Sequence, residues 1–299
     1  MKVSVIIPTQ NRPQLLLKAI ASIEQQTLLP EEIIVIDDAS QEDYWQEIKS
    51  QIAPIMQSRA VWQRLPRASG ASIARNKGAE VATGDILMFL DDDDTWTPDK
   101  IANQVKIFQD NPEIGLVYAG RRVVDEQGQL LFVITPKIQG KIYTELLQSN
   151  CVGVTSSVAI RKEVFQAVGG FDPQMPGRQD YDLWVRIARI TDISFDPNPT
   201  VNWTVHSQPG KQMNSRPELY KRAVELFINK YQQDLAQLPF LKKRKAYASH
   251  YTMLADKYGQ VGSWRQYWYV LRSLILYPSA AALARLLPYS FYLQLRKFN

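Results

Sequence analysis

The sequence predicts an α/β fold with a mostly parallel central sheet, followed by a C-terminal α-helical region. Strand and helix patterns alternate through the first 90 residues, and beyond Arg216 only helical patterns remain. The chain has 299 residues, of which 45% are hydrophobic, and this suffices for one large α/β domain and an appendage. We therefore expect one domain over residues 1–210 and a helical region over residues 211–299.

Four short runs rich in β-branched and apolar residues predict the first strands of the sheet. These runs are residues 2–7, 32–37, 60–65 and 85–90. Because helical patterns separate the runs, the strands should form βαβ units. Such units place parallel strands side by side and cover both faces of the sheet with helices.

Two helices are predicted between these strands. Residues 14–26 carry apolar side chains at helical spacing, and Pro13 suits the first turn of this helix. Residues 72–82 are predicted to form the second helix, which we expect to begin near Ser69 or Ser72.

Polar clusters follow three of the predicted strands. They read PTQNR, DDAS and DDDDTW, at residues 8–12, 37–40 and 91–96. In parallel sheets, ligands bind beyond the carboxyl ends of the strands. The three clusters should therefore meet at one edge of the sheet and form a binding site.

The third cluster contains four consecutive carboxylates, Asp91 to Asp94, with no basic residue before Lys100. Like charges repel, so the run is either a solvated loop or a site that expects a cation. Neither a dinucleotide-binding GxGxxG nor a phosphate-binding GxxxxGK[ST] occurs, and a calcium loop would need Asp and Gly at Thr95 and Trp96. Hard oxygen ligands favour magnesium or manganese, which bridges carboxylates to a diphosphate.

Composition excludes several other classes of protein. The single cysteine, Cys151, excludes a disulfide framework and a cysteine-rich zinc site, and it fits a reducing, cytoplasmic compartment. The apolar run at the N-terminus is too short for a signal-peptide core. No segment reaches the roughly 18 uninterrupted apolar residues that a membrane span needs.

Five longer motifs follow one another along the chain. They are VSVIIPTQNRP, IIVIDDAS, ASIARNKGA, ILMFLDDDDTWTPDK and GGFDPQMPGRQDYDLWVRI. In order and approximate spacing they resemble the motifs of the family 2 glycosyltransferases, over about residues 1–210. The resemblance implies the glycosyltransferase A fold, which is a Rossmann-like nucleotide-sugar-binding domain. It also implies a metal-dependent, inverting transfer of a sugar from a nucleoside-diphosphate donor.

The resemblance implies donor-binding roles for residues near the strand ends. These are Thr9, Asn11, Arg12, Asp38, Arg75 and Asn76. Asp38 resembles the carboxylate that accepts the ring N–H of the base, and its alternative is a helix-cap or turn aspartate. The alternative for Thr9, Asn11 and Arg12 is a turn that leads into the first helix. For Arg75 it is an ion pair on a helix surface.

Asp91 and Asp93 correspond to the D-x-D pair of the family. Strand alternation sends positions i and i+2 to the same side, so both carboxylates can converge on one cation and on the ribose hydroxyls. The resemblance implies Asp93 as a metal ligand and Asp91 as a metal or sugar contact. Asp94 is expected beside the donor sugar, and Asp92 is counted with the donor site although it should face away. His206 resembles histidines near the metal or diphosphate, and its alternative is an exposed residue at a strand end.

Asp180 falls where the family carries its general base, in a motif usually written E-D, and here Gln179 replaces the Glu. This role requires one carboxylate that takes the proton of the acceptor hydroxyl as the oxygen attacks the anomeric carbon. The alternative is that Asp180 or Asp182 caps the following helix. Gly169 and Gly170 indicate a close backbone approach to a substrate or a plain turn.

The C-terminal region differs from the rest of the chain in charge. Residues 211–299 carry 15 Lys and Arg against 4 Asp and Glu, whereas the remainder carries 20 against 26. We expect no nucleic-acid partner. The alternatives are contact with an anionic membrane surface, docking on a partner enzyme, packing on the catalytic domain alone, or a solvated helical face. Aromatic residues favour the membrane: Trp264, Tyr267, Trp268, Tyr269, Tyr277 and Tyr289. Residues 207–215 are predicted to form a flap over the donor.

The expected acceptor is a carbohydrate or a lipid-linked glycan, in the synthesis of polysaccharide, lipid-linked oligosaccharide or another cell-surface glycan. A carboxylate at Asp38 suits the imide N–H of uracil and thymine, so UDP- and dTDP-sugars are favoured and GDP-sugars stay open. Two other classes are alternatives: a nucleotidyltransferase, whose phosphate loop is missing here, and a silent nucleotide-sugar-binding protein of the same fold. The joint presence of Asp93 and Asp180 favours an enzyme.

Overall fold

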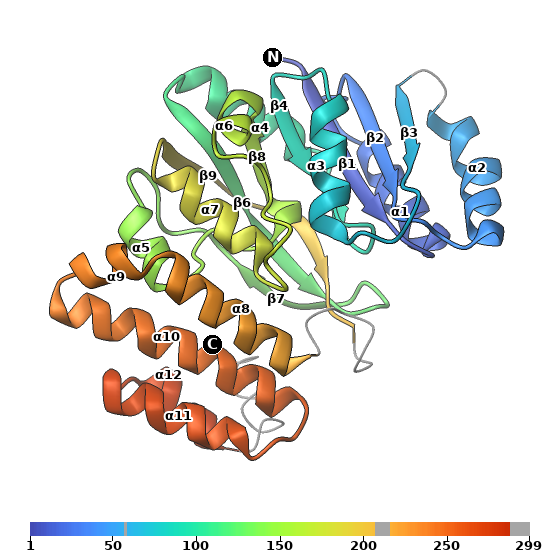
Figure 1. Ribbon diagram of the computed structural model, residues 1–299. Helices are drawn as coiled ribbons and strands as arrows, with labels where there is room; N and C mark the ends of the chain where they lie inside the picture. The colour runs from blue at the N-terminus through green and yellow to red at the C-terminus, as the bar shows by residue number, and fades with distance from the viewer. Residues whose placement is uncertain (57–58, 207–215, 288–299) are drawn as a thin grey trace. The chain divides into compact units, whose positions relative to one another are not determined.

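The computed structural model describes residues 1–56, 59–206 and 216–287 (Figure 1). The chain forms two compact units. The first unit consists of Met1–Ile142, Val152–Pro173 and Gln179–Val205. The second consists of Tyr143–Cys151, Gln174–Arg178 and the chain from His206 onward. Two short segments that come before His206 in the sequence therefore belong to the second, helical unit.

The first unit is built on a nine-stranded sheet, in the order β3-β2-β1-β4-β8-β6-β9-β5, with β7 paired to β6. The strands are β1 (Val3–Thr9), β2 (Glu32–Asp37), β3 (Ala60–Arg64), β4 (Ile86–Phe89), β5 (Thr95–Trp96), β6 (Ile114–Val124), β7 (Leu130–Ile134), β8 (Val158–Arg161) and β9 (Asp192–Thr204). Strands β1 to β4 are parallel to one another, and β6 is parallel to β9. Strands β5, β7 and β8 are antiparallel to their neighbours. The predicted mostly parallel α/β sheet is confirmed.

The helices of the first unit are α1 (Pro13–Glu24), α2 (Glu42–Met56), α3 (Ala71–Val81), α4 (Lys100–Asp110), α6 (Lys162–Ala167) and α7 (Gln179–Ala188). Helix α3 lies across β1 and β2 on the near face of the sheet (Figure 1). Every residue of β1 and β2 is buried, as expected for parallel strands with helices on both faces. Burial on both faces explains why these strands read as continuous apolar runs.

Helix α3 begins at Ala71, between Ser69 and Ser72, as the sequence predicted. Neither Ser69 nor Ser72 caps this helix; its first turn follows Gly70, which has a φ of +89°. Glycine adopts this left-handed conformation without the steric cost of a Cβ atom. The free backbone N–H groups here bond to a carboxylate on another strand end, as described below, and a local serine cap is therefore not needed.

The second unit is helical, as predicted for the C-terminal region. Its helices are α5 (Tyr143–Gln148), α8 (Pro217–Lys230), α9 (Gln232–Gln237), α10 (Phe240–Gln260), α11 (Arg265–Leu276) and α12 (Ala280–Leu283), followed by the 3-10 turn η3 (Ala284–Leu286). Its core gathers apolar and aromatic side chains of α8, α10 and α11: Val224, Leu254, Ala255, Tyr258, Tyr269 and Val270. In the part of the chain that the structure describes, no helix is both long and apolar enough to cross a membrane.

Lys100, the first basic residue after the acidic run, does not pair with these acids. It is 0% exposed at the start of α4, where its Nζ donates to Oε1 of Gln104 and lies 5.0 Å from the ring centroid of Trp96. Burial lowers the pKa of the Lys100 amine to about 7, although Asp196 opposes this shift. The acids must therefore be balanced by other groups.

The buried amine predicts a pH-dependent stability. Between about pH 7 and pH 10.4 the unfolded chain binds a proton at Lys100 that the folded chain lacks, so the free energy of unfolding should rise with pH. Lys100→Met should therefore stabilise the fold by about 1–2 kcal/mol near pH 6, and by less at pH 9. Urea unfolding at both pH values measures this difference. Lys106→Met, at an exposed site on the same helix, is the control, and an equal gain at both pH values would contradict the assignment.

Candidate functional site

The acidic run forms a tight turn directly after β4. The backbone N–H of Asp94 donates to the carbonyl of Asp91 at 3.0 Å, and β5 begins at Thr95. The expectation that strand alternation orders these side chains is therefore wrong, because the strand ends at Phe89. The turn nevertheless leaves Asp91 and Asp93 half-buried and buries Asp92 and Asp94.

Burial raises the pKa of two of the four acids. Burial raises the pKa of Asp92 to about 6, against the opposing effect of Arg12. Burial, together with the charges of Asp93 and Asp91, raises the pKa of Asp94 well above its usual value. A raised pKa favours the neutral acid and so relieves part of the repulsion within the run.

Asp92 and Asp94 use their carboxylates to fix the turn. Asp92 accepts a hydrogen bond from the Thr9 hydroxyl at 2.8 Å, and Asp94 accepts one from the Ser156 hydroxyl at 2.5 Å and one from the backbone N–H of Thr204 at 3.0 Å. These contacts tie the end of β4 to β1, η1 (Thr155–Ser157) and β9. The predicted donor contacts of Thr9, Asp92 and Asp94 would have to form beside these bonds.

Arg12 lies against the acidic turn. Its Nη1 is 3.1 Å from Oδ1 of Asp92 and 3.2 Å from Oδ2 of Asp93, and the nearby carboxylates raise its pKa although burial opposes this. The guanidinium thus places a positive charge between two acids of the run. The charge of Arg12 offsets part of the repulsion among the four adjacent acids.

Arg75, on α3, pairs with the remaining half-buried acid. Its Nη2 donates to Oδ1 of Asp91, and its guanidinium carbon lies 5.3 Å from the ring centroid of Phe171. The alternative for Arg75 was an ion pair on an exposed helix surface. Arg75 is buried, so its ion pair with Asp91 is part of the acidic turn's surroundings.

Asp38 follows β2, and its carboxylate anchors the loop before α3. Oδ1 accepts the backbone N–H of Ser69 at 2.6 Å, and Oδ2 accepts that of Gly70 at 2.8 Å. Asp38 therefore bonds to the backbone just before a helix, as the helix-cap alternative requires. The helix is α3, which begins more than 30 residues later in the sequence. Each carboxylate oxygen keeps a further lone pair for a ligand.

Asn11 shapes the loop after β1. It has a φ of +55°, its backbone N–H donates to the Ser40 hydroxyl at 2.8 Å, and its side-chain oxygen accepts the N–H of Gln41 at 2.7 Å. This oxygen thereby satisfies a backbone donor just before α2. The turn reading of Asn11 matches these contacts, and its donor contact stays a prediction.

Asn76 holds the segment around Phe171 by two hydrogen bonds. Its Nδ2 donates to the Phe171 carbonyl at 2.8 Å, and its Oδ1 accepts the Phe171 N–H at 2.9 Å. Gly170 makes this approach feasible, because a Cβ atom there would lie 2.7 Å from the Asn76 oxygen. The close backbone approach predicted at Gly170 therefore involves Asn76, and both polar atoms of the Asn76 amide are used within the protein.

Two adjacent glycine variants test this close approach. Gly169 and Gly170 both have positive φ, but only at Gly170 would a Cβ atom meet neighbours within 4 Å. Gly169→Ala should cost about 1 kcal/mol of stability for its backbone alone. Gly170→Ala should cost at least about 1 kcal/mol more, because Asn76 must move. Urea unfolding measures the free energy of unfolding of both variants. Equal losses of stability would contradict the close approach of Asn76 to Gly170.

Asp180 lies in the first turn of α7. Its Oδ1 accepts the backbone N–H of Tyr181 at 2.7 Å, and the residue is half-buried. Asp182 is instead fully buried and accepts a hydrogen bond from Nε of Arg186 at 2.9 Å. Of the two acids, Asp180 is the one with exposed surface, so it is the better candidate for a base.

A series of contacts joins the acidic turn to α7. Arg75 bridges Asp91 and Phe171, and the ring of Phe171 lies 6.5 Å from that of Trp184 in an edge-on arrangement. Trp184 is 0% exposed and donates from Nε1 to the Gly153 carbonyl at 3.1 Å, so its ring is part of the core. These contacts hold the helix that carries Asp180 and the acidic turn in one unit.

The sequence analysis missed Ser156. Its hydroxyl accepts the N–H of Asp91 at 3.1 Å while donating to Asp94, and its carbonyl accepts Nε1 of Trp96 at 2.9 Å. Ser156 is fully buried at the centre of the acidic turn. Three small hydroxyl residues before β8 were the available signal, and this pattern is too common to identify a site.

The predicted metal site depends on the carboxylate oxygens of Asp91 and Asp93. Within residues 1–56, 59–206 and 216–287, no group of three or more His, Cys, Asp or Glu side chains is arranged to hold a metal ion. Magnesium and manganese need fewer protein ligands, because water and substrate phosphates complete their shells. Asp91 and Asp93 offer hard oxygens, and Arg12 already holds a positive charge against Asp93. The donor atoms of Asp91 and Asp93 are of the kind that fits a divalent cation, and their role as metal ligands stays a prediction.

His206 belongs to the second unit. It directly precedes residues 207–215, the predicted flap, which lie outside the described residues. Its role as a metal ligand stays a prediction. Tyr289, counted among the aromatic residues of the C-terminal region, also lies outside the described part of the chain.

The geometry can now be compared with known proteins. The model of glycosyl transferase family 2 matches residues 4–169 of the chain. An uncharacterized glycosyltransferase of Haemophilus influenzae is 30% identical over 210 residues, which cover 69% of each chain. The glycosyltransferase YwdF of Bacillus subtilis is 29% identical over 213 residues, 67% of this chain and 73% of that one. A relative from Rickettsia bellii is longer, and the match spans 34% of its length.

Solved structures share the fold at low sequence identity. Crystalline S. aureus TarS 1-349 in complex with UDP-GlcNAc has a TM-score of 0.61 at 14% identity, over 100% of this chain and 93% of that one. The mannosyltransferase PcManGT from Pyrobaculum calidifontis, in complex with GDP-Man and Mn2+, has a TM-score of 0.58 at 16% identity, over 99% and 87%. The family model and the relatives identify this α/β protein as a transferase. The chain belongs to glycosyl transferase family 2 and has the glycosyltransferase A fold.

Proposed function

We propose that this enzyme transfers a sugar, with inversion, from a nucleoside-diphosphate-sugar to an acceptor hydroxyl on a carbohydrate or a lipid-linked glycan. The observation that carries the proposal is the acidic turn at the carboxyl end of β4, whose carboxylates are organised around the charge of Arg12. A solvated acidic loop would not need buried hydrogen bonds from three other elements. A preformed carboxylate site at this edge of the sheet is what a metal-bound diphosphate requires.

Asp91 and Asp93 would hold a divalent cation, manganese or magnesium, with His206 as a further ligand. When bound, this cation neutralises the charge that develops on the leaving diphosphate. Asp38 would accept the ring N–H of the base, and Arg12 and Arg75 would contact the phosphates or ribose. Thr9, Asn11, Asn76, Asp92 and Asp94 would shape the donor site from the positions that their present contacts fix.

Asp180 would act as the general base. Its carboxylate takes the proton of the acceptor hydroxyl while the oxygen attacks the anomeric carbon from the face opposite the diphosphate. The new glycosidic bond forms as the bond to the diphosphate oxygen breaks, so the anomeric centre inverts. The half-buried position of Asp180 in the first turn of α7 supports this role, because part of its side chain stays accessible to an acceptor, unlike that of Asp182.

UDP-sugars and dTDP-sugars are the favoured donors, because the Asp38 carboxylate can accept the imide N–H of uracil and thymine. Fold neighbours have been crystallised with UDP-GlcNAc and with GDP-Man and Mn2+, which supports a nucleotide-sugar donor and a divalent cation without choosing the base. We place the enzyme in the cytoplasm, in the synthesis of a cell-surface glycan, with residues 211–299 in peripheral contact with an anionic membrane surface.

Melting temperatures across a panel of sugar nucleotides, each with and without manganese, test the proposal. A ligand that binds only the folded state at 100 times its dissociation constant adds about 2.7 kcal/mol of stability. We expect a manganese-dependent rise with at least one UDP- or dTDP-sugar, followed by release of nucleoside diphosphate. Release of pyrophosphate would indicate a nucleotidyltransferase, and binding without turnover a silent binder.

A further inference from the structure

Helix α11 has apolar side chains on two opposite faces. The inner face packs against α10 and buries Gln266, Tyr269, Val270 and Ser273. The outer face exposes 73% of Trp264, 49% of Trp268, 51% of Leu271 and 65% of Ile275. Their spacing of four, three and four residues aligns them in one stripe along the helix. We call these four residues the α11 stripe.

The elements that follow α11 also expose apolar side chains. Leu283 of α12 and Leu286 of η3 are 53% and 48% exposed, and both elements contact α11, η3 through the buried Gln266. Scattered exposed apolar residues are normal on a protein surface, but a contiguous row that includes two tryptophans marks an interaction surface. Tryptophan in particular settles where an apolar phase meets water.

Positive charges flank the α11 stripe. The guanidinium of Arg272 lies 5.1 Å from the ring centroid of Trp268. Arg265 follows Trp264 directly, and its Nη1 lies 2.5 Å from Oε1 of Glu218. Residues 211–299 as a whole carry 15 Lys and Arg against 4 Asp and Glu. An apolar row edged with cations suits a partner that is apolar inside and anionic at its surface.

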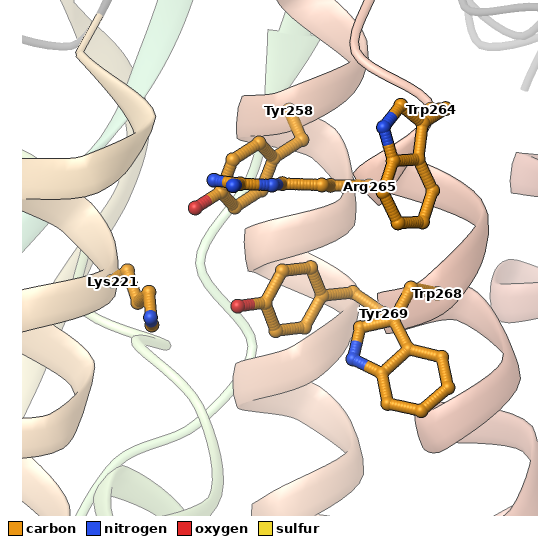
Figure 2. Close-up of a pocket in the computed structure, with 6 residues that line it drawn as sticks. All are labelled: Lys221, Tyr258, Trp264, Arg265, Trp268 and Tyr269. Atoms are coloured by element: carbon orange, nitrogen blue, oxygen red, sulfur yellow. The ribbon is translucent and has the colours of Figure 1, made fainter.

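An open hollow of about 520 Å³ lies at the foot of the stripe (Figure 2). Trp264 and Trp268 lie on one side of it, and the hydroxyls of Tyr258 and Tyr269 point toward the side where Lys221 lies. The Tyr258 hydroxyl donates to Glu218. The Tyr269 hydroxyl has no hydrogen-bond partner among the described residues, so it is a donor that an anion could use. The Lys221 amine lies 3.8 Å from Oε1 of Glu225, and an anion in the hollow would compete with this exposed ion pair.

The ring geometry disfavours a sugar in this hollow. The rings of Tyr258 and Tyr269 stack on each other at 5.2 Å, and Tyr251 covers the other side of Tyr269 at 6.1 Å. Their faces are therefore not available to stack on a pyranose. A second copy of this chain is disfavoured as well, because two strongly basic surfaces repel each other.

We propose that the α11 stripe docks this enzyme on an anionic phospholipid membrane. The stripe inserts at the boundary between headgroups and acyl chains, Arg265 and Arg272 meet phosphates, and the hollow beside Lys221 receives one anionic headgroup. The inference deepens the membrane contact in the proposed function by naming the surface and the partner. It does not depend on glycosyl transfer.

Co-sedimentation of the full chain with lipid vesicles tests this surface. One set of vesicles contains phosphatidylcholine alone, and the other contains phosphatidylcholine with phosphatidylglycerol. Wild-type protein should bind the anionic vesicles, and binding should weaken at high salt. Trp264→Ser combined with Ile275→Ser should weaken binding at least about tenfold. Arg272→Gln should weaken it about fivefold. Leu130→Ser with Ile190→Ser, at exposed sites of the first unit, is the matched control and should bind normally.

Several outcomes would overturn the inference. These are equal binding to neutral and anionic vesicles, no binding to either, or an equal loss in the control pair. Self-association that the stripe variant abolishes, without vesicle binding, would assign the face to a second copy. The donor-dependent melting shift is measured on the same variants. Vesicle binding without any donor response counts only against the proposed function, and the reverse counts only against this inference.

Discussion

Asp93→Ala is expected to abolish metal-dependent donor binding. Asp93 is a half-buried acid of the turn with an oxygen directed at a cationic group, since its Oδ2 lies 3.2 Å from Arg12. Removal of this carboxylate takes away a hard oxygen ligand at the point where the diphosphate should bind. The loss should reach about 3 kcal/mol, or more than 100-fold in donor affinity.

The stability of the ligand-free protein should change little in this variant. Arg12 keeps its ion pair with Asp92, and the turn keeps its bonds to Thr9 and Ser156. Melting curves with a donor and manganese should therefore lose their shift, while curves without ligand should match the wild type. Asp110→Ala, at an exposed acid on α4, controls for the loss of a charge. A full manganese-dependent shift in Asp93→Ala would end the metal assignment.

Asp180→Asn is expected to leave donor binding nearly intact and to remove transfer. Asparagine keeps the size of the side chain and an oxygen that can accept the N–H of Tyr181, but it cannot take a proton. A positioned general base contributes about 10²–10⁴-fold to rate, so turnover should fall by this factor. Donor-dependent release of nucleoside diphosphate in the presence of the acceptor measures the loss.

The neighbouring acid separates catalysis from helix stability. Asp182 is fully buried and paired with Arg186, so Asp182→Asn should lower the melting temperature. The rate per folded molecule should change far less than in Asp180→Asn. Full transfer activity in Asp180→Asn would show that the base lies elsewhere.

Local patterns in the sequence predicted the architecture well. The β-branched runs of β1 to β4 and the helical spacing of α1 and α3 are local signals, and the structure places these elements within a few residues of the predicted bounds. The helical pattern beyond Arg216 is divided at Tyr231 into α8 and α9. Helix boundaries depend on local packing, which periodicity alone does not report.

The sequence by itself determined which chemistry gathers at the edge of the sheet. Parallel strands end on one side, so the acids after β4 and the polar residues after β1 and β2 had to meet there. The family motifs identified the same residues, and the comparisons confirm the family.

Only the tertiary structure decided how these residues are used. Thr9 bonds to Asp92 across 83 positions of the chain, Asn76 to Phe171 across 95, and Ser156 to Asp94 across 62. No local pattern encodes such pairs, because each depends on where distant elements pack. The same is true of the buried arginine at position 75 and of the raised pKa of Asp94, which follow from burial and neighbouring charge once the chain has folded.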